Sequence, residues 1–443
     1  MGITRLRLAF AGIAIILTTL WLLSLPDSAL TAGFWPVRRT LINFTGVLAI
    51  GFMSASIVLA ARPVQIEPLL GGLDKFYRLH KWLGIGAAAI GLVHWLLEIV
   101  PRWMVGQGWL APPVRRAGGG PAGANPFADW HGIGAEVGEW GFYLLLVLVV
   151  IALWKRFPYH LFFKTHRLMA VVYLLLAFHA IVLMPPAYWT APIGPATAVL
   201  LAGGSAAAVI SLFRRIGHSR RAVGRVEYFK QYFGNAVLEV GVRFDTAWPG
   251  HQAGQFAFVR FEGREGAHPF TISSAWRQDG QVVFSIKGLG DYTRALPEML
   301  RVGQTVTVEG PYGRFDFRGK CSRQLWIGGG IGITPFIAGL QARAAATDAA
   351  VPVDLIYSTS APDAAFIDNI RQLAEQAGVR FHLLVTPQDG LLTLDRLAAI
   401  LPQWKEADIW FCGPAGFGQS LYDAMTARGL PPRQFHRELF DMR

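Results

Sequence analysis

The feature that most constrains this chain is a series of six apolar stretches, each long enough to cross the roughly 30 Å hydrocarbon core of a membrane. They lie near residues 8–25, 40–61, 77–100, 137–154, 166–184 and 193–213. The first is expected to be a retained helix and not a signal peptide, because it has no convincing small-residue cleavage site and five more stretches follow. The sequence therefore predicts a six-helix membrane-spanning bundle in residues 1–216.

Basic residues predict how this bundle lies in the membrane. They cluster near the N-terminus (Arg5, Arg7), within 155–164 and within 214–221. Because such clusters stay in the cytoplasm, both termini are expected there. The same clustering accounts for the formal charge of +12, so we expect a lipid bilayer and no nucleic acid as partner. The Gly/Pro-rich segment 101–135 is then expected to be an exposed outer loop.

Four histidines lie inside the apolar stretches, in two pairs: His80 with His94, and His166 with His179. Ionisable side chains are costly at membrane depth and usually have a function there. The separations of 14 and 13 residues correspond to about 20 Å along a helix. Since imidazole suits iron, the third and fifth helices are predicted to hold two haems, the inner by His80 and His166 and the outer by His94 and His179.

The two spacings do not support this prediction equally. Fourteen residues return to nearly the same helix face, whereas thirteen land about 140° away, so the fifth helix needs a bulge, a tilt or a lateral offset between the haems. The alternative is that these histidines are satisfied core residues or interfacial anchors that bind nothing.

Residues beyond 217 predict two further domains. Alternating strand patterns at 236–242, 255–261, 282–287 and 305–308 predict a small antiparallel β-barrel in 217–320. From 321, short apolar strands at 324–327, 353–357, 381–385 and 409–411 alternate with helical stretches, which predicts an α/β domain with a parallel sheet in 321–443. The cysteines, Cys321 and Cys412, are far apart, so neither a disulfide frame nor a thiolate metal site is indicated.

Three motifs in these domains predict cofactor binding. A glycine run at 328–332 follows a strand and opens a helix, where small residues admit a cofactor and the helix N-terminus attracts phosphate. Segment 287–293 places glycines before another helix and predicts a second phosphate site. Segment 268–274, HPFTISS, is a strand edge that offers hydroxyls and amides to a planar ring.

These motifs resemble known families. The membrane half resembles the ferric reductase transmembrane domain of NADPH oxidases and ferric-chelate reductases, in which six helices hold two b-type haems through histidines at these spacings on helices three and five. The soluble half resembles the ferredoxin-NADP reductase superfamily, with the HPFT form typical of NADPH oxidases at 268–271 and a second nicotinamide motif at 412–417. The resemblance implies a bacterial inner-membrane protein with a haem-binding bundle, an FAD-binding barrel and an NAD(P)H-binding α/β domain.

The resemblance also implies which residues hold the soluble cofactors. The flavin ring and ribityl chain of FAD are expected at His268, Pro269, Phe270 and Thr271, and its phosphates near Ser274, Lys287, Gly290 and Thr293. Ser273 is also expected to contact FAD. Phe440 matches the aromatic residue that covers the flavin face. NAD(P)H is expected at Gly328, Gly329, Gly330, Gly332, Thr334, Pro335, Cys412, Gly413 and Pro414. Thr359 and Ser360 stand where many NADPH-dependent relatives have an arginine for the 2′-phosphate, so use of NADH is a live alternative to NADPH.

Together these features predict an enzyme, an NAD(P)H oxidase or ferric reductase with FAD and two haem b groups. Its external acceptor is a small molecule: oxygen, giving superoxide, is favoured because HPFT and the compact chain resemble bacterial NADPH oxidases, and a ferric chelate is the alternative. Glu98, one turn beyond His94, and Arg39, near the outer start of the second helix, are candidates for an acceptor site, a haem-propionate contact or a plain interfacial ion pair.

No calcium gating and no obligatory protein partner are expected. Two rival functions remain open at this stage. One is a membrane cytochrome that exchanges electrons with quinone or a periplasmic protein. The other is a transporter or structural bundle whose histidines bind nothing.

Overall fold

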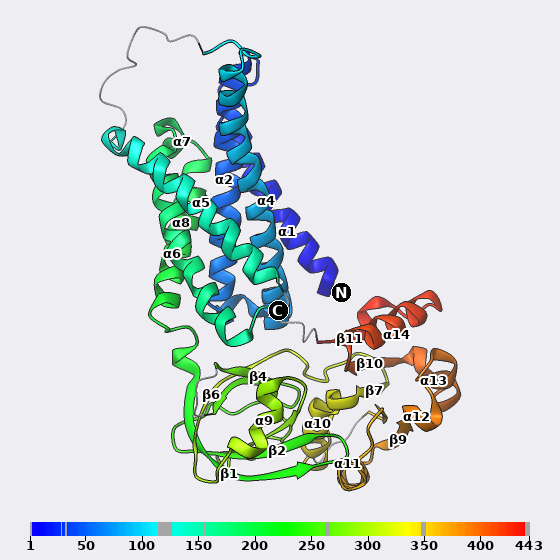
Figure 1. Cartoon of the computed structure of the whole chain (residues 1–443). Coiled ribbons are helices and arrows are strands. Elements are labelled where there is room, and N and C mark those ends of the chain that lie inside the picture. Colours follow the sequence, from blue (N-terminus) through cyan, green and yellow to red (C-terminus); the bar gives the residue numbers. More distant parts are fainter. Residues whose placement is uncertain are drawn as a thin grey trace. The chain divides into compact units, whose positions relative to one another are not determined.

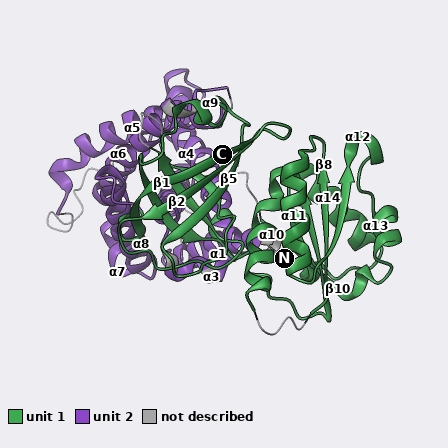
Figure 2. Cartoon of the chain, turned by 90° about the horizontal axis from the view of Figure 1, so that it is seen from below, with its two compact units in different colours: residues 1, 72–74, 217–443 green, residues 2–71, 75–216 purple. Residues whose placement is uncertain are grey.

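The computed structural model describes residues 2–27, 29–31, 33–113, 126–154, 156–261, 266–346 and 351–438. These residues form two compact units, which are coloured separately in Figure 2. One comprises residues 2–71 and 75–216. The other comprises residues 72–74 and 217–443, and contains two sheets.

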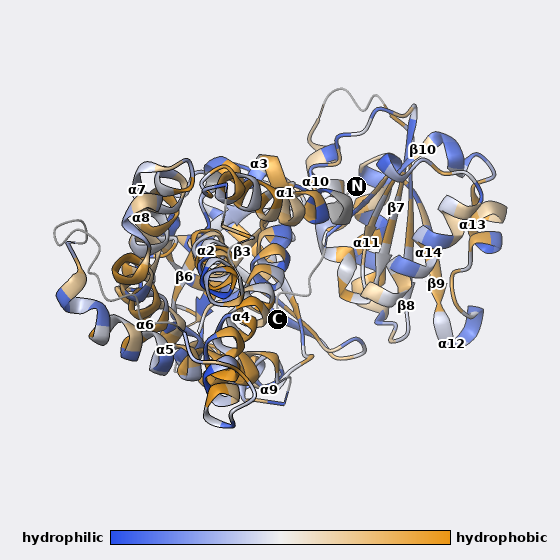
Figure 3. Ribbon diagram, turned by 90° about the horizontal axis from the view of Figure 1, so that it is seen from above, coloured by the Kyte–Doolittle hydropathy of each residue, from blue (hydrophilic) through white to orange (hydrophobic). Residues whose placement is uncertain are grey.

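The first unit is a helix bundle (Figure 1). Its elements are α1 (Gly2–Leu22), α2 (Phe34–Ala60), α3 (Glu67–Leu70), α4 (Leu73–Gly106), α5 (His131–Leu153), α6 (Tyr159–Leu183), α7 (Pro186–Thr190) and α8 (Ile193–Leu212). Among the described residues, six of these helices are long and apolar enough to cross a membrane: α1, α2, α4, α5, α6 and α8. Hydrophobic residues run along them (Figure 3). The six predicted spans are therefore confirmed.

The predicted outer loop at 101–135 is shorter than expected. Helix α4 continues through Pro101 to Gly106, and α5 already begins at His131. Proline is tolerated inside membrane helices because neighbouring groups satisfy the freed carbonyl, which the Gly/Pro composition did not reveal. The glycine-rich part of the predicted loop, 114–125, lies outside the described residues.

Small residues let the bundle helices pack closely. Helix α5 packs along α6, and α2 along α8. At the centre, the hydroxyl of Tyr173 in α6 lies 2.8 Å from Ser54 Oγ of α2 and donates to the carbonyl of Leu201 in α8 at 3.4 Å. A Cβ atom on Gly204 would overlap that hydroxyl. A fully buried polar group thus ties three helices together, which is the use that membrane bundles make of small and hydroxyl-bearing residues.

The first sheet of the second unit is antiparallel and has six strands in the order β4-β3-β6-β1-β2-β5. The strands are β1 (Arg221–Tyr232), β2 (Val237–Phe244), β3 (Phe256–Phe261), β4 (His268–Thr271), β5 (Gln281–Lys287) and β6 (Thr305–Tyr312), with helix α9 (Asp291–Met299) before β6. The edge strands β4 and β5 form no continuous ladder: just beyond β4, an isolated bridge joins Ile272 to Phe284 of β5, and the amide of Ser273 donates to the carbonyl of Val283. The predicted barrel is therefore an open sheet whose two edges are joined by a few bonds at one end.

The sequence patterns did not predict β1, although it is the longest strand of this sheet. Its pairing with β2 shifts between Val226 and Tyr228. Such a bulge moves the following side chains to the other face, so the strict alternation that marks a strand is broken.

The second sheet is parallel, in the order β11-β10-β7-β8-β9. Its elements are β7 (Arg323–Gly329), the short helix η4 (Gly330–Ile333), α10 (Thr334–Ala344), β8 (Val353–Thr359), α11 (Ala364–Gln376), β9 (Arg380–Val385), α12 (Thr386–Asp389), α13 (Leu394–Ile400), β10 (Ala407–Cys412), α14 (Ala415–Ala427) and β11 (Phe435–Arg437). The four predicted strands match β7 to β10, and strands alternate with helices as expected for a parallel sheet.

A buried carboxylate holds the start of β10. Asp408 accepts hydrogen bonds from the amides of Lys320 at 2.7 Å and Cys321 at 2.8 Å, and its other oxygen lies 3.0 Å from His436 Nε2. Burial raises the pKa of Asp408, but these hydrogen bonds and the imidazole outweigh it and hold the pKa below its usual value. The ionised form of Asp408 therefore stabilises the folded sheet.

Candidate functional site

The bundle brings the four predicted histidines together in two pairs, each formed by one side chain of α4 and one of α6. The ring centres of His80 and His166 lie 5.8 Å apart, with their planes at 75°. Those of His94 and His179 lie 6.3 Å apart, with their planes at 83°. Helices α4 and α6 thus carry two histidine pairs at different depths of the bundle, with the partners that the sequence predicted. Each pair is called a station below.

This geometry fits two axial ligands of one metal. An imidazole nitrogen lies about 2.0–2.1 Å from a bound metal and roughly 1.1 Å from its own ring centre, so two rings on one metal have centres about 6.3 Å apart. Both observed separations are close to that value. Among the described residues, no group of three or more His, Cys, Asp and Glu side chains gathers to hold a bare ion. Two imidazoles complete the coordination of a haem, which brings four nitrogens of its own.

Backbone carbonyls fix which nitrogen of each ring faces its partner. The Nδ1 atom of His80 lies 2.8 Å from the carbonyl and 2.8 Å from the hydroxyl of Ser56 on α2. His94 Nδ1 lies 3.0 Å from the carbonyl of Ile42 and 3.1 Å from Thr45 Oγ1, also on α2. A carbonyl only accepts, so Nδ1 carries the hydrogen and Nε2 keeps the lone pair that a metal needs.

The two α6 histidines are anchored differently. His179 Nδ1 donates to the carbonyl of Gly134 on α5 at 2.8 Å. His166 Nδ1 is buried and has no hydrogen-bond partner in the described part of the chain, and its ring stacks on Phe162 one turn earlier, at 5.0 Å and 17°. Helix α6 is an uninterrupted α-helix, so the 13-residue spacing is accommodated without a bulge, by imidazoles that leave different faces of the helix.

A glycine on α5 makes room for the His179 ring. A Cβ atom on Gly138 would lie 2.7 Å from His179 Cγ, and closer still to Nδ1 and Cε1. Any side chain at position 138 would therefore displace the imidazole. No sequence pattern pointed to Gly138, Ser56 or Thr45, because their role depends on which helices are neighbours.

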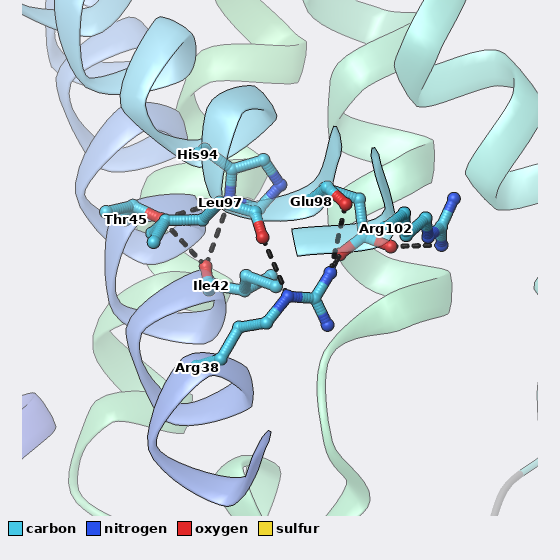
Figure 4. Close-up of polar contacts among 7 residues, drawn as sticks. All are labelled: Arg38, Ile42, Thr45, His94, Leu97, Glu98 and Arg102. Carbon is cyan, nitrogen blue, oxygen red and sulfur yellow. Dashed lines mark hydrogen bonds and ion pairs between the residues drawn. The ribbon is translucent and has the colours of Figure 1, made fainter. Parts of the chain in front are cut away.

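At the His94–His179 end of the bundle, an arginine joins α2 to α4 (Figure 4). Arg38 donates from Nε to the carbonyl of Leu97 at 2.7 Å and forms an ion pair with Glu98, which also pairs with Arg102. The expected partner of Glu98 was Arg39. Adjacent residues point about 100° apart on a helix, and Arg38 is the one that faces α4.

In the sheet of β1 to β6, the HPFT segment forms the edge strand β4. Its four residues, His268, Pro269, Phe270 and Thr271, are all half-buried, and His268 stacks on Tyr292 of α9 at 4.4 Å. The two serines that follow are turned inward. Ser273 Oγ donates to the carbonyl of Val283, and Ser274 Oγ accepts from the amide of Val283. These two hydroxyls are engaged in bonds that join β4 to β5. A flat ring placed on this edge would therefore contact the side chains of the HPFT segment before those of the two serines.

The turn before α9 is built as the motif suggested. Gly290 is the N-cap residue, and Thr293 Oγ1 accepts hydrogen bonds from the amides of Leu289 and Gly290, each at 3.0 Å. The Thr293 hydroxyl therefore holds the turn that presents the start of the helix. Lys287 ends β5 and lines a narrow cleft. That cleft is lined by Asn235, Val237, Lys287, Gly330, Ile331, Tyr357, Thr359 and Phe366.

The two nucleotide motifs meet at the carboxyl ends of neighbouring strands. Cys412 of β10 pairs in register with Gly328 of β7. A Cβ on Gly332 would overlap the carbonyl of Cys412, and a Cβ on Gly413 would lie 3.0 Å from Gly329 Cα. The glycines are thus needed for close backbone packing between the motifs. Burial raises the pKa of the Cys412 thiol well above its usual value, so this side chain is neutral.

The remaining predicted nucleotide residues complete the same edge. Gly330 adopts a positive φ of 56° at the start of η4, Thr334 Oγ1 donates to the carbonyl of Ile331, and Pro335 stands in the first turn of α10. Pro414 precedes α14 as its N-cap. Phe440 lies outside the described residues.

Between β8 and α11 lies an acid, Asp363, that the sequence patterns did not single out. Asp363 caps α11 by accepting from the amide of Phe366 at 3.0 Å, and also accepts from the amide of Gly234 at 2.9 Å. Thr359 Oγ1 donates to the carbonyl of Ala361. The basic residue that follows on α11, Arg371, pairs with Asp368 on the exposed face of the helix.

Comparisons with known proteins match both halves. Residues 45–177 match the ferric reductase like transmembrane component family, and residues 229–316 match an FAD-binding domain family. The ferredoxin reductase component of 3-ketosteroid-9-alpha-monooxygenase from Rhodococcus rhodochrous is 30% identical over 200 residues, which cover 43% of this chain and 56% of that protein. The flavohemoprotein of Pseudomonas putida is 32% identical over 161 residues, 34% of this chain and 40% of that protein.

The chain spans about half the length of the curated relatives it matches. Among solved structures, the flavohemoglobin of Malassezia yamatoensis is 17% identical, covers 91% of this chain and 98% of its own, and has a TM-score of 0.48.

The helix bundle therefore lies in the part of the chain that is similar to the ferric reductase like transmembrane component, and the antiparallel sheet lies in the part that is similar to an FAD-binding domain.

Proposed function

We propose that this protein passes electrons from NAD(P)H through FAD and two b-type haems across a membrane to an acceptor on the far side. The observation that carries the proposal is the pair of histidine stations, with ring centres 5.8 and 6.3 Å apart on the same two helices. A transporter or structural bundle would have no need for two such pairs in which three of the four Nδ1 atoms are directed at backbone carbonyls.

Bound FAD would supply the exchange between two-electron and one-electron transfer, and the haems would supply one-electron stations. The course of the chain supports an order for these stations. Helix α8 runs antiparallel to α6 and ends at Leu212, at the end of the bundle that carries His80 and His166. The flavin domain follows directly in sequence, so His80 and His166 would hold the entry station. His94 and His179 would hold the exit station.

The basic clusters support a bacterial inner-membrane location with both termini in the cytoplasm. NAD(P)H would then be oxidised inside and the acceptor reduced outside. The nucleotide would lie over the glycines at 328–332 and the 412–414 motif, and the FAD ring on the β4 edge.

For the acceptor, we propose oxygen, giving superoxide, on the resemblance of the HPFT segment to NADPH oxidases. A ferric chelate is the second candidate, because three arginines gather at the His94–His179 end of the bundle. No described feature favours a quinone or a partner protein, so these serve as outcomes of the test.

The test uses purified full-length protein in detergent with NADH or NADPH. We expect a reduced-minus-oxidised spectrum of b-type haem, and electron delivery to oxygen that superoxide dismutase reveals. His94→Ala should abolish delivery to the acceptor while flavin reduction continues. The exposed His218, in the short helix η3 (His218–Arg220), offers the matched control His218→Ala, which should leave both steps intact. Absence of a haem spectrum, or delivery to quinone alone, would contradict the proposal.

A further inference from the structure

Three arginines line one pocket at the end of the bundle that carries His94 and His179. The pocket has a volume of 380 Å³ and is formed by side chains of α2, α4 and the segment that follows α4. Its lining is Trp35, Arg38, Arg39, Arg102, Val105 and Pro113. The basic clusters that predict the orientation of the bundle belong to the opposite ends of the spans, so the positive-inside rule does not account for these arginines.

The charges in this pocket do not cancel. Glu98 is the one carboxylate that pairs with the lining arginines among the described residues, and it is shared by Arg38 and Arg102. Arg39 is exposed and makes no hydrogen bond or ion pair with the described residues. Because guanidinium groups stay protonated, three arginines and one carboxylate leave about two positive charges.

The three arginines are held to different degrees. Arg38 is 14% exposed and donates to the carbonyls of Leu97 and Glu98 as well as to the Glu98 carboxylate (Figure 4). It also lies over the Trp35 ring, at 5.5 Å. Arg102 is 67% exposed and pairs with the same carboxylate. Arg38 is therefore a fixed wall of the pocket, whereas the exposed guanidinium groups of Arg39 and Arg102 can turn towards a ligand.

Tryptophans around the pocket indicate its depth in the membrane. Trp35 lines the pocket, and Trp103 and Trp109, which stand close in sequence to its other lining residues, are exposed with ring centres 5.1 Å apart. Tryptophan is enriched where membrane helices pass the lipid headgroups, because its ring is apolar and its N–H is polar. The pocket is therefore expected at the level of the lipid phosphates.

An apolar face of α4 leads away from the pocket towards the middle of the bundle. Its members are exposed and recur at spacings of three and four residues: Val93, Leu96, Val100 and Trp103. Such spacing places them along one side of the helix, and lipid chains are the apolar partner that a membrane offers to an exposed face. Arg102 directly precedes Trp103. A lipid whose chains cover this face would thus carry its phosphate close to Arg102.

We propose that the pocket binds the phosphate of an anionic phospholipid, whose acyl chains lie on the exposed face of α4. Guanidinium groups match phosphate oxygens with pairs of N–H donors, and basic pockets between membrane helices suit lipid headgroups. The excess positive charge favours an anionic lipid over a zwitterionic one, whose cationic group would be repelled. The volume lies within the range of small-molecule sites, so it admits a headgroup.

Lipid binding goes beyond the proposed electron transfer and does not depend on it. Glu98 and Arg102 follow His94 by one and two turns of α4, or about 6 and 12 Å along the helix, so the bound phosphate would border the exit station. A lipid held there would occupy the arginines that otherwise favour a ferric chelate. Oxygen, which needs no charged pocket, then stays the proposed acceptor.

The test is native mass spectrometry of the purified full-length protein, freed of lipid in neutral detergent and titrated with phosphatidylglycerol, phosphatidylcholine or inorganic phosphate. One phosphatidylglycerol should bind at least about fivefold more tightly than phosphatidylcholine, because each arginine near an anionic headgroup contributes about that factor. Arg39→Gln and Arg102→Gln should each raise the Kd for phosphatidylglycerol about fivefold. Arg7→Gln removes the same charge from an exposed site on α1 and should leave this Kd unchanged.

Four results would overturn the proposal. The first is an equal Kd of the wild-type protein for phosphatidylglycerol and phosphatidylcholine. The second is an equal Kd for phosphatidylglycerol in the wild type and both pocket variants. The third is displacement of phosphatidylglycerol by inorganic phosphate at similar concentration, which would assign the pocket to a free anion. The fourth is loss of a bound haem in Arg39→Gln, which would assign the arginines to a haem propionate.

Discussion

Replacing Gly138 by alanine should dislodge one ligand of the exit station without harming the bundle. A Cβ at this position would lie 2.7 Å from His179 Cγ, whereas ordinary van der Waals contact begins at 3.4 Å. The ring must therefore retreat by at least about 0.7 Å at Cγ, and further at Nδ1 and Cε1. Metal–nitrogen distances tolerate only about 0.2 Å. Because His179 Nδ1 is also held by the Gly134 carbonyl, the imidazole cannot move without losing that hydrogen bond.

The cost to folding should be small. Alanine is favoured over glycine inside a helix by about 1 kcal/mol, which offsets the loss of a hydrogen bond of similar size. We therefore expect Gly138→Ala to fold with near wild-type stability and to hold one low-spin b-type haem per chain in place of two.

The assay is haem content per protein together with the reduced-minus-oxidised spectrum. Gly132→Ala, on the same helix with no atom within 4 Å of the added Cβ, should retain both haems. If Gly138→Ala keeps two haems with unchanged spectra, the assignment of His179 is wrong. If Gly132→Ala loses a haem equally, the effect belongs to the helix and not to the contact.

Three further changes test other parts of the structure. Tyr173→Phe removes a buried hydroxyl that ties three helices and should destabilise the bundle by about 1 kcal/mol; an unchanged melting temperature would refute this role. Asp363→Asn keeps the helix cap but removes a negative charge near the position expected for the ribose of NAD(P)H. It should raise kcat/KM for NADPH relative to NADH roughly fivefold, which corresponds to about 1 kcal/mol. The exposed Glu375→Gln on the same helix should not, and equal shifts in both variants would disprove a local effect. The pKa of Asp408 is lower in the folded protein than in the unfolded chain. Ionised Asp408 therefore stabilises the fold above the ordinary aspartate pKa of about 4, and this stabilisation is lost as the pH falls through the folded pKa. Asp408→Asn should flatten the fall of the unfolding temperature between about pH 5 and 3, and an equally steep fall would count against the ionised carboxylate.

Much of the architecture could be predicted because it follows from local rules. Apolar stretches of sufficient length specify membrane helices wherever they occur, since backbone groups in lipid must be paired within the segment. Strand-like segments alternating with helical ones likewise specify the parallel sheet of β7 to β10. Strands β1 and β11 were both missed. Strand β1 carries a bulge, which changes the face of its side chains in a way that only the neighbouring strand explains.

The candidate site also has a part that local sequence rules predicted and a part that only the tertiary structure decided. By itself the sequence determined the four histidines and their pairing across two helices, because the pattern is a matter of spacing and depth. It also determined the glycines that allow the two nucleotide motifs to approach. Tertiary structure alone decided what surrounds them: the carbonyls of Ser56, Ile42 and Gly134 that orient three imidazoles, and the choice of Arg38 over Arg39 as partner of Glu98. The physical reason is that spacing along a helix says which residues share a face, whereas the rotation of one helix against the next decides what that face meets.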